Sequence, residues 1–106
     1  ALRIMKLVEA LPRNQAGKTI GYQLIRSGTS VGANYRSACR GRSKAEFIAK
    51  LGIALEEADE CAYWIELIIE GNLLKKELLE PLLSEANELA AILNSSIKTA
   101  RRNPKS

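Results

Sequence analysis

Positively charged side chains recur between Arg13 and Lys50, and their spacing is their most informative property. This stretch holds eight Lys or Arg residues against one acid, Glu46, a local balance of +7. If residues 15–41 form one continuous helix, four cations fall within about 80° of one another on its surface, opposite the apolar face: Lys18, Arg26, Arg36 and Arg40. Arg42 and Lys44 continue this row beyond the helix. Cations so spaced match the repeat of a nucleic-acid backbone and gain affinity by releasing counterions.

The basic row allows more than one interpretation. It can be a solvated surface, a strip that contacts the phosphates of RNA or DNA, or a surface that pairs with acids of another subunit. Residues 51–90 carry the opposite balance of −8, with ten acids against Lys75 and Lys76. We predict contact with nucleic acid and keep a protein-interaction scaffold as the alternative. The predicted nucleic-acid-binding residues are Lys18, Arg26, Arg36, Arg40, Arg42 and Lys44.

Residue types suited to catalysis or metal binding are scarce. The sequence has no histidine, so it lacks the usual general base, the Ser-His and Cys-His nucleophile pairs and the commonest zinc ligand. The acidic pairs at 56–57 and 59–60 lack the Glu-x-x-His partners of di-iron bundles. Cys39 and Cys61 are far apart, without neighbouring ligands, and we interpret them as reduced thiols. We therefore expect no enzyme activity, no metal and no cofactor.

A second apolar row lies beside the expected core stripe in the middle of the sequence. Ile53, Trp64 and Leu67 fall on one side of the expected helix, with Glu57 and Glu60 next to them. An exposed tryptophan aligned with two aliphatic residues indicates an interface. We predict an oligomer interface formed by these five residues. The alternative is that Trp64 covers a neighbouring helix of the same subunit, and the acids could also meet the basic row of the next subunit in a ring-forming contact.

Apolar periodicity predicts the elements that would position these residues. Four helices are expected, at about 1–11, 15–41, 43–70 and 76–102. Asn14 and Ser43 are the expected N-caps, and Ser43 forms a capping box with Glu46. Gly71 is a fitting residue just past the end of the third helix. The polar tail from Arg101 onward is expected to fray.

The second predicted helix is rich in glycine. Gly21, Gly28, Gly32 and Cys39 fall together beside its core face, where small residues would let another helix approach closely. Glycine is also a poor helix former, so a kink or break near Gly28 is the other interpretation. The expected core face consists of Ala16, Ile20, Leu24, Val31, Tyr35 and Ala38.

Four amphipathic segments joined by short connections predict an all-α fold. The simplest arrangement is a left-handed, antiparallel, up-down-up-down four-helix bundle, with residues 1–106 as a single domain. No apolar run approaches the roughly 20 residues needed to span a bilayer, and no secretory signal is recognisable. A soluble, cytoplasmic protein is expected.

Two stretches of the sequence carry a resemblance to a known family. They are TSVGANYRSACRGRSKAEFIAKLGIALEEADECAYWIELI at 29–68 and LLEPLLSEANELAAILNSSIKTA at 78–100, and the blocks TSVGAN and SKAEF are the most specific. Both closely resemble the bacterial four-helix-bundle family of 23S ribosomal RNA intervening-sequence proteins. The resemblance covers nearly the whole chain, although family members usually carry several more residues before the first helix.

This resemblance implies an up-down bundle in the bacterial cytoplasm that forms ring-like homo-oligomers, typically pentamers. A relative of the family, the accessory variability determinant of diversity-generating retroelements, is a basic pentameric bundle that binds nucleic acid and a reverse transcriptase. The resemblance therefore implies RNA or DNA, and a protein such as a reverse transcriptase, as partners. It supplies no catalytic residues. The family name records the position of some genes within ribosomal RNA genes and does not demonstrate binding to ribosomal RNA.

Overall fold

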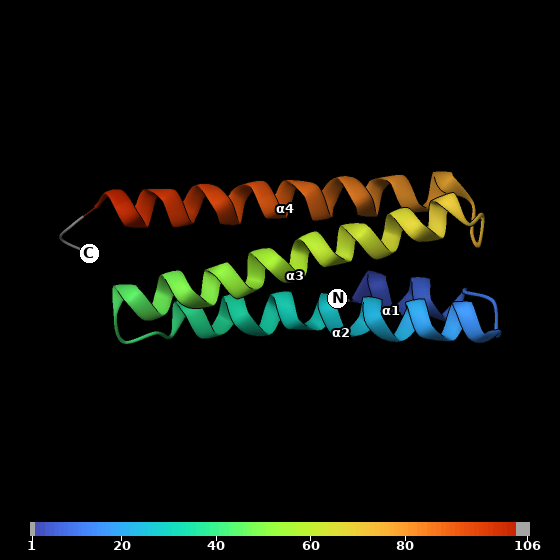
Figure 1. Ribbon diagram of the computed structural model, residues 1–106, viewed down its shortest axis with the longest axis horizontal. Helices are drawn as coiled ribbons and strands as arrows, with labels where there is room; N and C mark the ends of the chain where they lie inside the picture. The colour runs from blue at the N-terminus through green and yellow to red at the C-terminus, as the bar shows by residue number, and fades with distance from the viewer. Residues whose placement is uncertain (1, 104–106) are drawn as a thin grey trace.

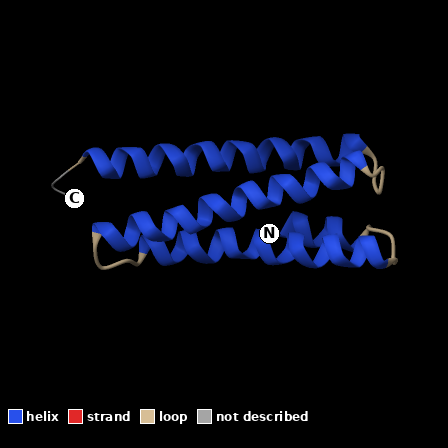
Figure 2. Ribbon diagram, in the orientation of Figure 1, coloured by secondary structure: helices blue, strands red, loops and turns tan. Residues whose placement is uncertain are grey.

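The computed structural model describes residues 2–103, and this part of the chain forms four α-helices joined by short loops. Successive helices run antiparallel along a body of 50 × 20 × 18 Å (Figure 1). They are α1 (Leu2–Glu9), α2 (Gln15–Cys39), α3 (Lys44–Glu70) and α4 (Lys76–Arg102). No strand occurs within residues 2–103 (Figure 2). The predicted all-α fold of four helices is confirmed.

The helices pack in chain order, and α3 is the central element. It lies against α2 on one side and against α4 on the other, while the short α1 packs against α2. The largest of the side chains that are less than 2% exposed are almost all aliphatic: Leu24, Leu51, Ile65, Ile68, Leu79, Leu93 and Ser27. Burial of such apolar surface is the main force that holds the bundle together.

Two residues expected in the core of α2 lie at the surface instead. Tyr35 is 52% exposed and Ala16 is also exposed, so both predictions were wrong. Tyr35 is exposed because α1 is too short to cover it. Helix α1 packs against the first half of α2 and contacts it as far as Gly28. Beyond Gly28, this flank of α2 has no neighbouring helix.

Both predicted N-caps are present. The Asn14 Oδ1 accepts a hydrogen bond from the Gly17 N–H at 2.8 Å, and the Ser43 Oγ accepts one from the Glu46 N–H at 3.1 Å. These bonds satisfy amides that have no partner within the first turn of a helix. Only one of the two hydrogen bonds of the predicted capping box forms. The Glu46 carboxylate accepts from the N–H of Arg42, at 3.2 Å, and not from the N–H of Ser43.

The end of α3 differs by one residue from the expectation. Gly71 has a right-handed φ of −82°, whereas Asn72 takes the left-handed conformation with φ at 52°. The Leu73 N–H donates to the Ile68 carbonyl and the Asn72 N–H to the Ile69 carbonyl, both at 3.1 Å. This is a Schellman motif in which asparagine, rather than glycine, is the left-handed residue.

Helix α2 continues unbroken through its glycines. A Cβ atom at Gly21 would lie 2.8 Å from Val8 Cγ1, and one at Gly28 would lie 2.7 Å from Ile4 Cδ1. The glycines at these two positions let α1 approach closely, so the packing interpretation is confirmed for them and the break near Gly28 does not occur. Close packing of α1 offsets the poor helix propensity of glycine.

Candidate nucleic-acid interface

The four predicted cations of α2 do not form one free row. Lys18, Arg36 and Arg40 are exposed, whereas Arg26 is partly buried and paired with α3. Lys18 precedes Arg36 by eighteen residues, which is about 27 Å along a helix that rises 1.5 Å per residue. The row is therefore divided into one cation near the start of α2, an engaged arginine in the middle and a group near the end.

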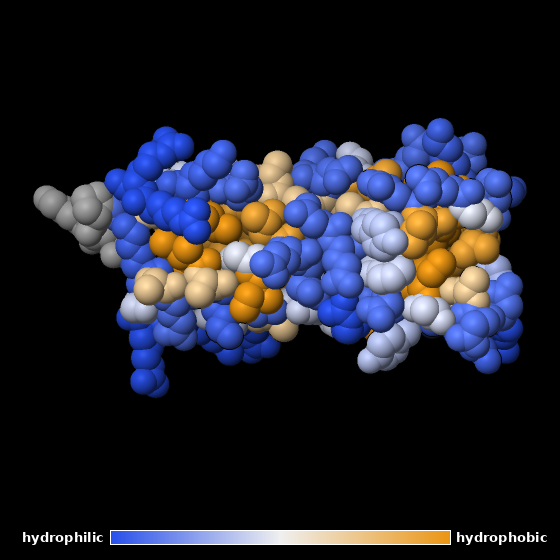
Figure 3. Space-filling view, in the orientation of Figure 1, coloured by the Kyte–Doolittle hydropathy of each residue, from blue (hydrophilic) through white to orange (hydrophobic). Residues whose placement is uncertain are grey.

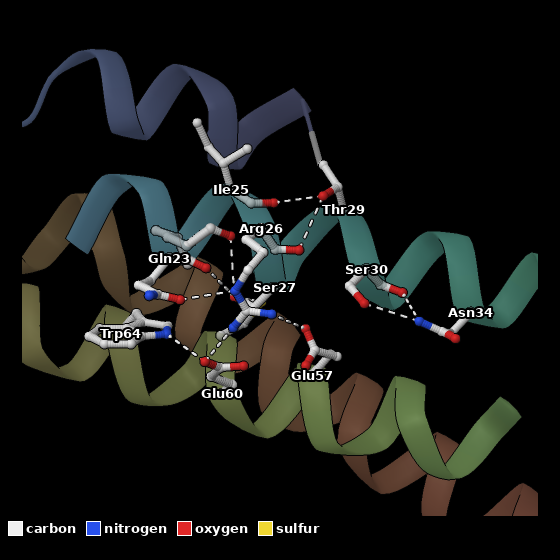
Figure 4. A network of polar contacts seen from close by, with 12 residues as sticks. Gln23, Ile25, Arg26, Ser27, Thr29, Ser30, Asn34, Glu57, Glu60 and Trp64 are labelled. Atoms are coloured by element: carbon white, nitrogen blue, oxygen red, sulfur yellow. Dashed lines mark hydrogen bonds and ion pairs between the residues drawn. The ribbon is translucent and has the colours of Figure 1, made fainter. Parts of the chain in front are cut away.

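Arg26 is held in a network between α2 and α3 (Figure 4). Its Nη1 donates to Glu57 Oε2 at 3.0 Å, its Nη2 donates to Glu60 Oε1 at 2.5 Å, and its Nε donates to Gln23 Oε1 at 2.9 Å. The Trp64 Nε1 donates to the same Glu60 oxygen at 3.3 Å. All three guanidinium nitrogens are thus engaged, and Arg26 pairs with two acids of its own chain.

The network stabilises the charged forms of its members. The hydrogen bond from Arg26 lowers the pKa of Glu60, a shift that desolvation opposes and the Trp64 hydrogen bond strengthens. The same bond to Glu60 raises the pKa of Arg26, against the effect of desolvation and with added attraction from Glu57. Charge-assisted bonds of this kind are stronger than bonds between neutral groups. Arg26 could contact a phosphate only by giving up these partners.

The cations that follow Arg26 are arranged differently. Arg36, Arg40 and Arg42 are exposed, and no carboxylate within residues 2–103 lies at ion-pair distance from any of them. Lys44 is partly buried, and its ammonium group donates to the backbone carbonyl of Asn103. These four residues surround the turn between α2 and α3, at one end of the molecule (Figure 1).

The last turns of α4 bring three further cations to this end of the bundle: Lys98, Arg101 and Arg102, all exposed. Arg101 and Arg102 were not predicted as binding residues because the chain from Arg101 onward was expected to fray, and Lys98 was not predicted because its neighbours at this end are distant in sequence. Arg101 and Arg102 belong to α4, while 104–106 lie outside the described residues. The predicted up-down order contained the signal, since it places the end of the fourth helix beside the second turn. We call these seven residues the cationic end: Arg36, Arg40, Arg42, Lys44, Lys98, Arg101 and Arg102.

The predicted oligomer interface on α3 is only partly exposed. Ile53 is 40% exposed, whereas Trp64 and Leu67 are partly buried and Trp64 packs against the core. Glu57 and Glu60 hold Arg26, as described above. The face drawn in Figure 3 carries two apolar areas, one toward each end, with hydrophilic side chains between them.

The two thiols have different surroundings. Cys61 is buried, its Sγ donates to Ser27 Oγ at 3.3 Å, and desolvation raises the pKa of the thiol, so it is protonated at neutral pH. Cys39 is exposed.

Within residues 2–103, no three His, Cys, Asp or Glu side chains gather as a metal site would need. None of the described helices combines the length and apolar character needed to cross a membrane.

Comparison with known proteins places these features in a family. The sequence profile described as 23S rRNA-intervening sequence protein matches residues 1–95. A crystal structure from Bacteroides thetaiotaomicron VPI-5482, of a protein with unknown function from the S23 ribosomal protein family, is similar with a TM-score of 0.85 and 41% identity. The match covers 92% of this chain and 90% of that one. No curated protein matches significantly. The chain therefore belongs to the 23S rRNA-intervening sequence protein family.

Proposed function

We propose that this protein is a non-enzymatic helical bundle that binds the backbone of RNA or DNA. The observation that carries the proposal is the group of cations around the turn between α2 and α3. Arg36, Arg40 and Arg42 are exposed and have no acidic partner within residues 2–103. Unpaired arginines at one end of a molecule attract a polyanion and gain free energy when its counterions are released.

The proposal gives different roles to the predicted residues. Arg36, Arg40, Arg42 and Lys44 make the phosphate contacts. Arg26 stabilises the bundle through its pairing with α3, and Lys18 contributes only long-range attraction because it lies near the other end of α2. Contacts of this kind position a nucleic acid but read little of its base sequence.

Binding should depend steeply on salt and on two arginines. We expect the native chain to bind a structured RNA at low salt, with log K falling linearly with log salt by about 0.7–0.9 per phosphate contact. Arg36→Glu with Arg40→Glu should lower the affinity at least tenfold, since it removes two contacts and adds two repulsive charges. A filter-binding titration across a salt series measures both. Absence of binding at low salt, or affinity unchanged in the double variant, would exclude the function.

A homo-oligomer is part of the proposal. Ile53, at 40% exposed, and Tyr63, at 52%, leave apolar surface on α3 that a second copy would cover. Ring assembly would multiply the cationic end into a larger basic surface. We propose a pentamer by resemblance, and a reverse transcriptase as one class of protein partner by resemblance to the accessory variability determinant.

The exposed apolar surface of α3 also supports the second candidate, a protein-interaction scaffold without a nucleic-acid role. In that case Arg36, Arg40 and Arg42 would pair with acids of a neighbouring subunit. The two candidates separate in the same titration, because a scaffold would assemble without binding RNA at low salt.

A further inference from the structure

We infer that the last turns of α4 form the second half of the nucleic-acid-binding surface. In this arrangement the backbone lies between the turn after α2 and the end of α4, and it is held by Arg40 and Arg42 from one side and by Lys98, Arg101 and Arg102 from the other. The inference rests on the proposed function and specifies which part of the molecule holds the ligand.

The two halves lie next to each other. The Lys44 ammonium at the start of α3 donates to the carbonyl of Asn103 at the end of α4. A surface cavity of 520 Å³ lies between the same two segments. Its walls are Ser43, Lys44 and Phe47 from the start of α3, and Ser95, Ser96, Thr99, Ala100 and Asn103 from the end of α4. Two segments that are distant in sequence thus form one surface.

The chemistry of this cavity suits a sugar-phosphate backbone. Four hydroxyl groups line it, from Ser43, Ser95, Ser96 and Thr99. Hydroxyls can donate hydrogen bonds to phosphate and sugar oxygens, and arginine and lysine neutralise the phosphate charge. The described residues 89–103 contain no acid, so no carboxylate side chain on the α4 side repels an anion. Exposed cations on both segments, together with these hydroxyl donors, distinguish this end of the molecule from a single basic row.

A simpler role for Arg101 and Arg102 must be separated from binding. Cations in the last turn of a helix interact favourably with its dipole, and this would explain their presence in α4 without a ligand. A dipole role affects only the stability of the helix. Phosphate contacts also affect the salt dependence of binding, which is therefore the decisive measurement.

Three double variants, each of which lowers the net charge from +4 to +2, separate these roles. Arg101→Gln with Arg102→Gln tests α4, Arg40→Gln with Arg42→Gln tests the turn, and Arg13→Gln with Lys18→Gln is the matched control at the opposite end. The probe is an RNA hairpin, titrated at several salt concentrations. Glutamine avoids placing an anion at the end of α4. Lys98→Gln, one turn earlier, gives a second test if the last turn frays, and circular dichroism checks the fold of each variant.

We expect the salt slope to fall by about 1.5 in the α4 and turn variants and by less than half of that in the control. Lys98→Gln should lower it by about 0.8. If the turn variant weakens binding while the α4 variant and Lys98→Gln behave like the control, this inference is wrong and the proposed function stands. If the native chain does not bind the hairpin at low salt, the proposed function itself fails.

Discussion

Arg26 shows how the partners of one residue decide its role. Its position on α2 is that of a phosphate contact, but Glu57 and Glu60 on α3 engage its guanidinium group. Their side chains are 16% and 31% exposed, so the removal of Arg26 would leave two neighbouring carboxylates without a cation. Breaking such a pair from one side is destabilising, because the remaining charges lose their compensation.

We therefore predict that Arg26→Met lowers the melting temperature at neutral pH but not in acid. The pKa of Glu60 is lowered in the folded state, so the stabilisation is present above the unfolded value of about 4.3 and disappears as pH falls through the folded-state pKa. Thermal unfolding between about pH 7 and pH 3 measures this. Arg36→Met, which removes an exposed arginine of the same helix, should leave the melting temperature unchanged. If Arg26→Met lowered the melting temperature by the same amount at every pH, the stabilising role of the ion pair with Glu60 would be contradicted.

At the scale of the elements, the contact between α1 and α2 depends on small residues. Gly21 faces Val8, and Gly28 faces Ile4, whereas a Cβ at Gly32 would have no neighbour within 4 Å. The same substitution should thus have opposite effects within one helix. The comparison isolates packing from helix propensity, because all three glycines lie in the interior of α2.

Gly21→Ala should destabilise the protein by about 1 kcal/mol, since overpacking typically costs about 1–3 kcal/mol and the gain in helix propensity is about 1 kcal/mol. Val8 is β-branched, so it cannot easily move away. Gly32→Ala should stabilise by about 0.5–1 kcal/mol. Urea unfolding gives both values. Equal effects of the two substitutions would show that α1 does not pack closely on α2.

Local signals in the sequence were sufficient to predict where the helices begin and end. They were insufficient to predict which side chains of each helix are exposed and which contact another helix. Asn14 and Ser43 cap their helices as predicted, because a cap depends on residues within one turn. The pairing of Arg26 could not be derived in the same way, since it depends on how α2 and α3 are rotated against each other. Tyr35 was misplaced because a helical wheel does not show how far a neighbouring helix extends. Lys98 was overlooked because its neighbours at the cationic end are distant in sequence.

At the scale of the whole molecule, the proposed assembly depends on the exposed apolar surface of α3. Ile53 is the most exposed residue of the predicted interface on α3. We predict that Ile53→Arg dissociates the proposed homo-oligomer, because a charge buried in an apolar interface loses its hydration. Light scattering measures the mass. Ile92→Arg is the matched control, since Ile92 is 60% exposed on α4 and lies outside the predicted interface. A monomeric native chain would rule out assembly through this face.

The position of Trp64 has a practical consequence for optical work on this protein. It is the single tryptophan of the chain, and its indole N–H donates to Glu60, the acid that also holds Arg26. Indole emission therefore monitors the junction of α2 and α3 without any added dye. The cationic end contains no indole, so a change in this emission reports the helix junction itself and not direct contact between a ligand and the cationic end.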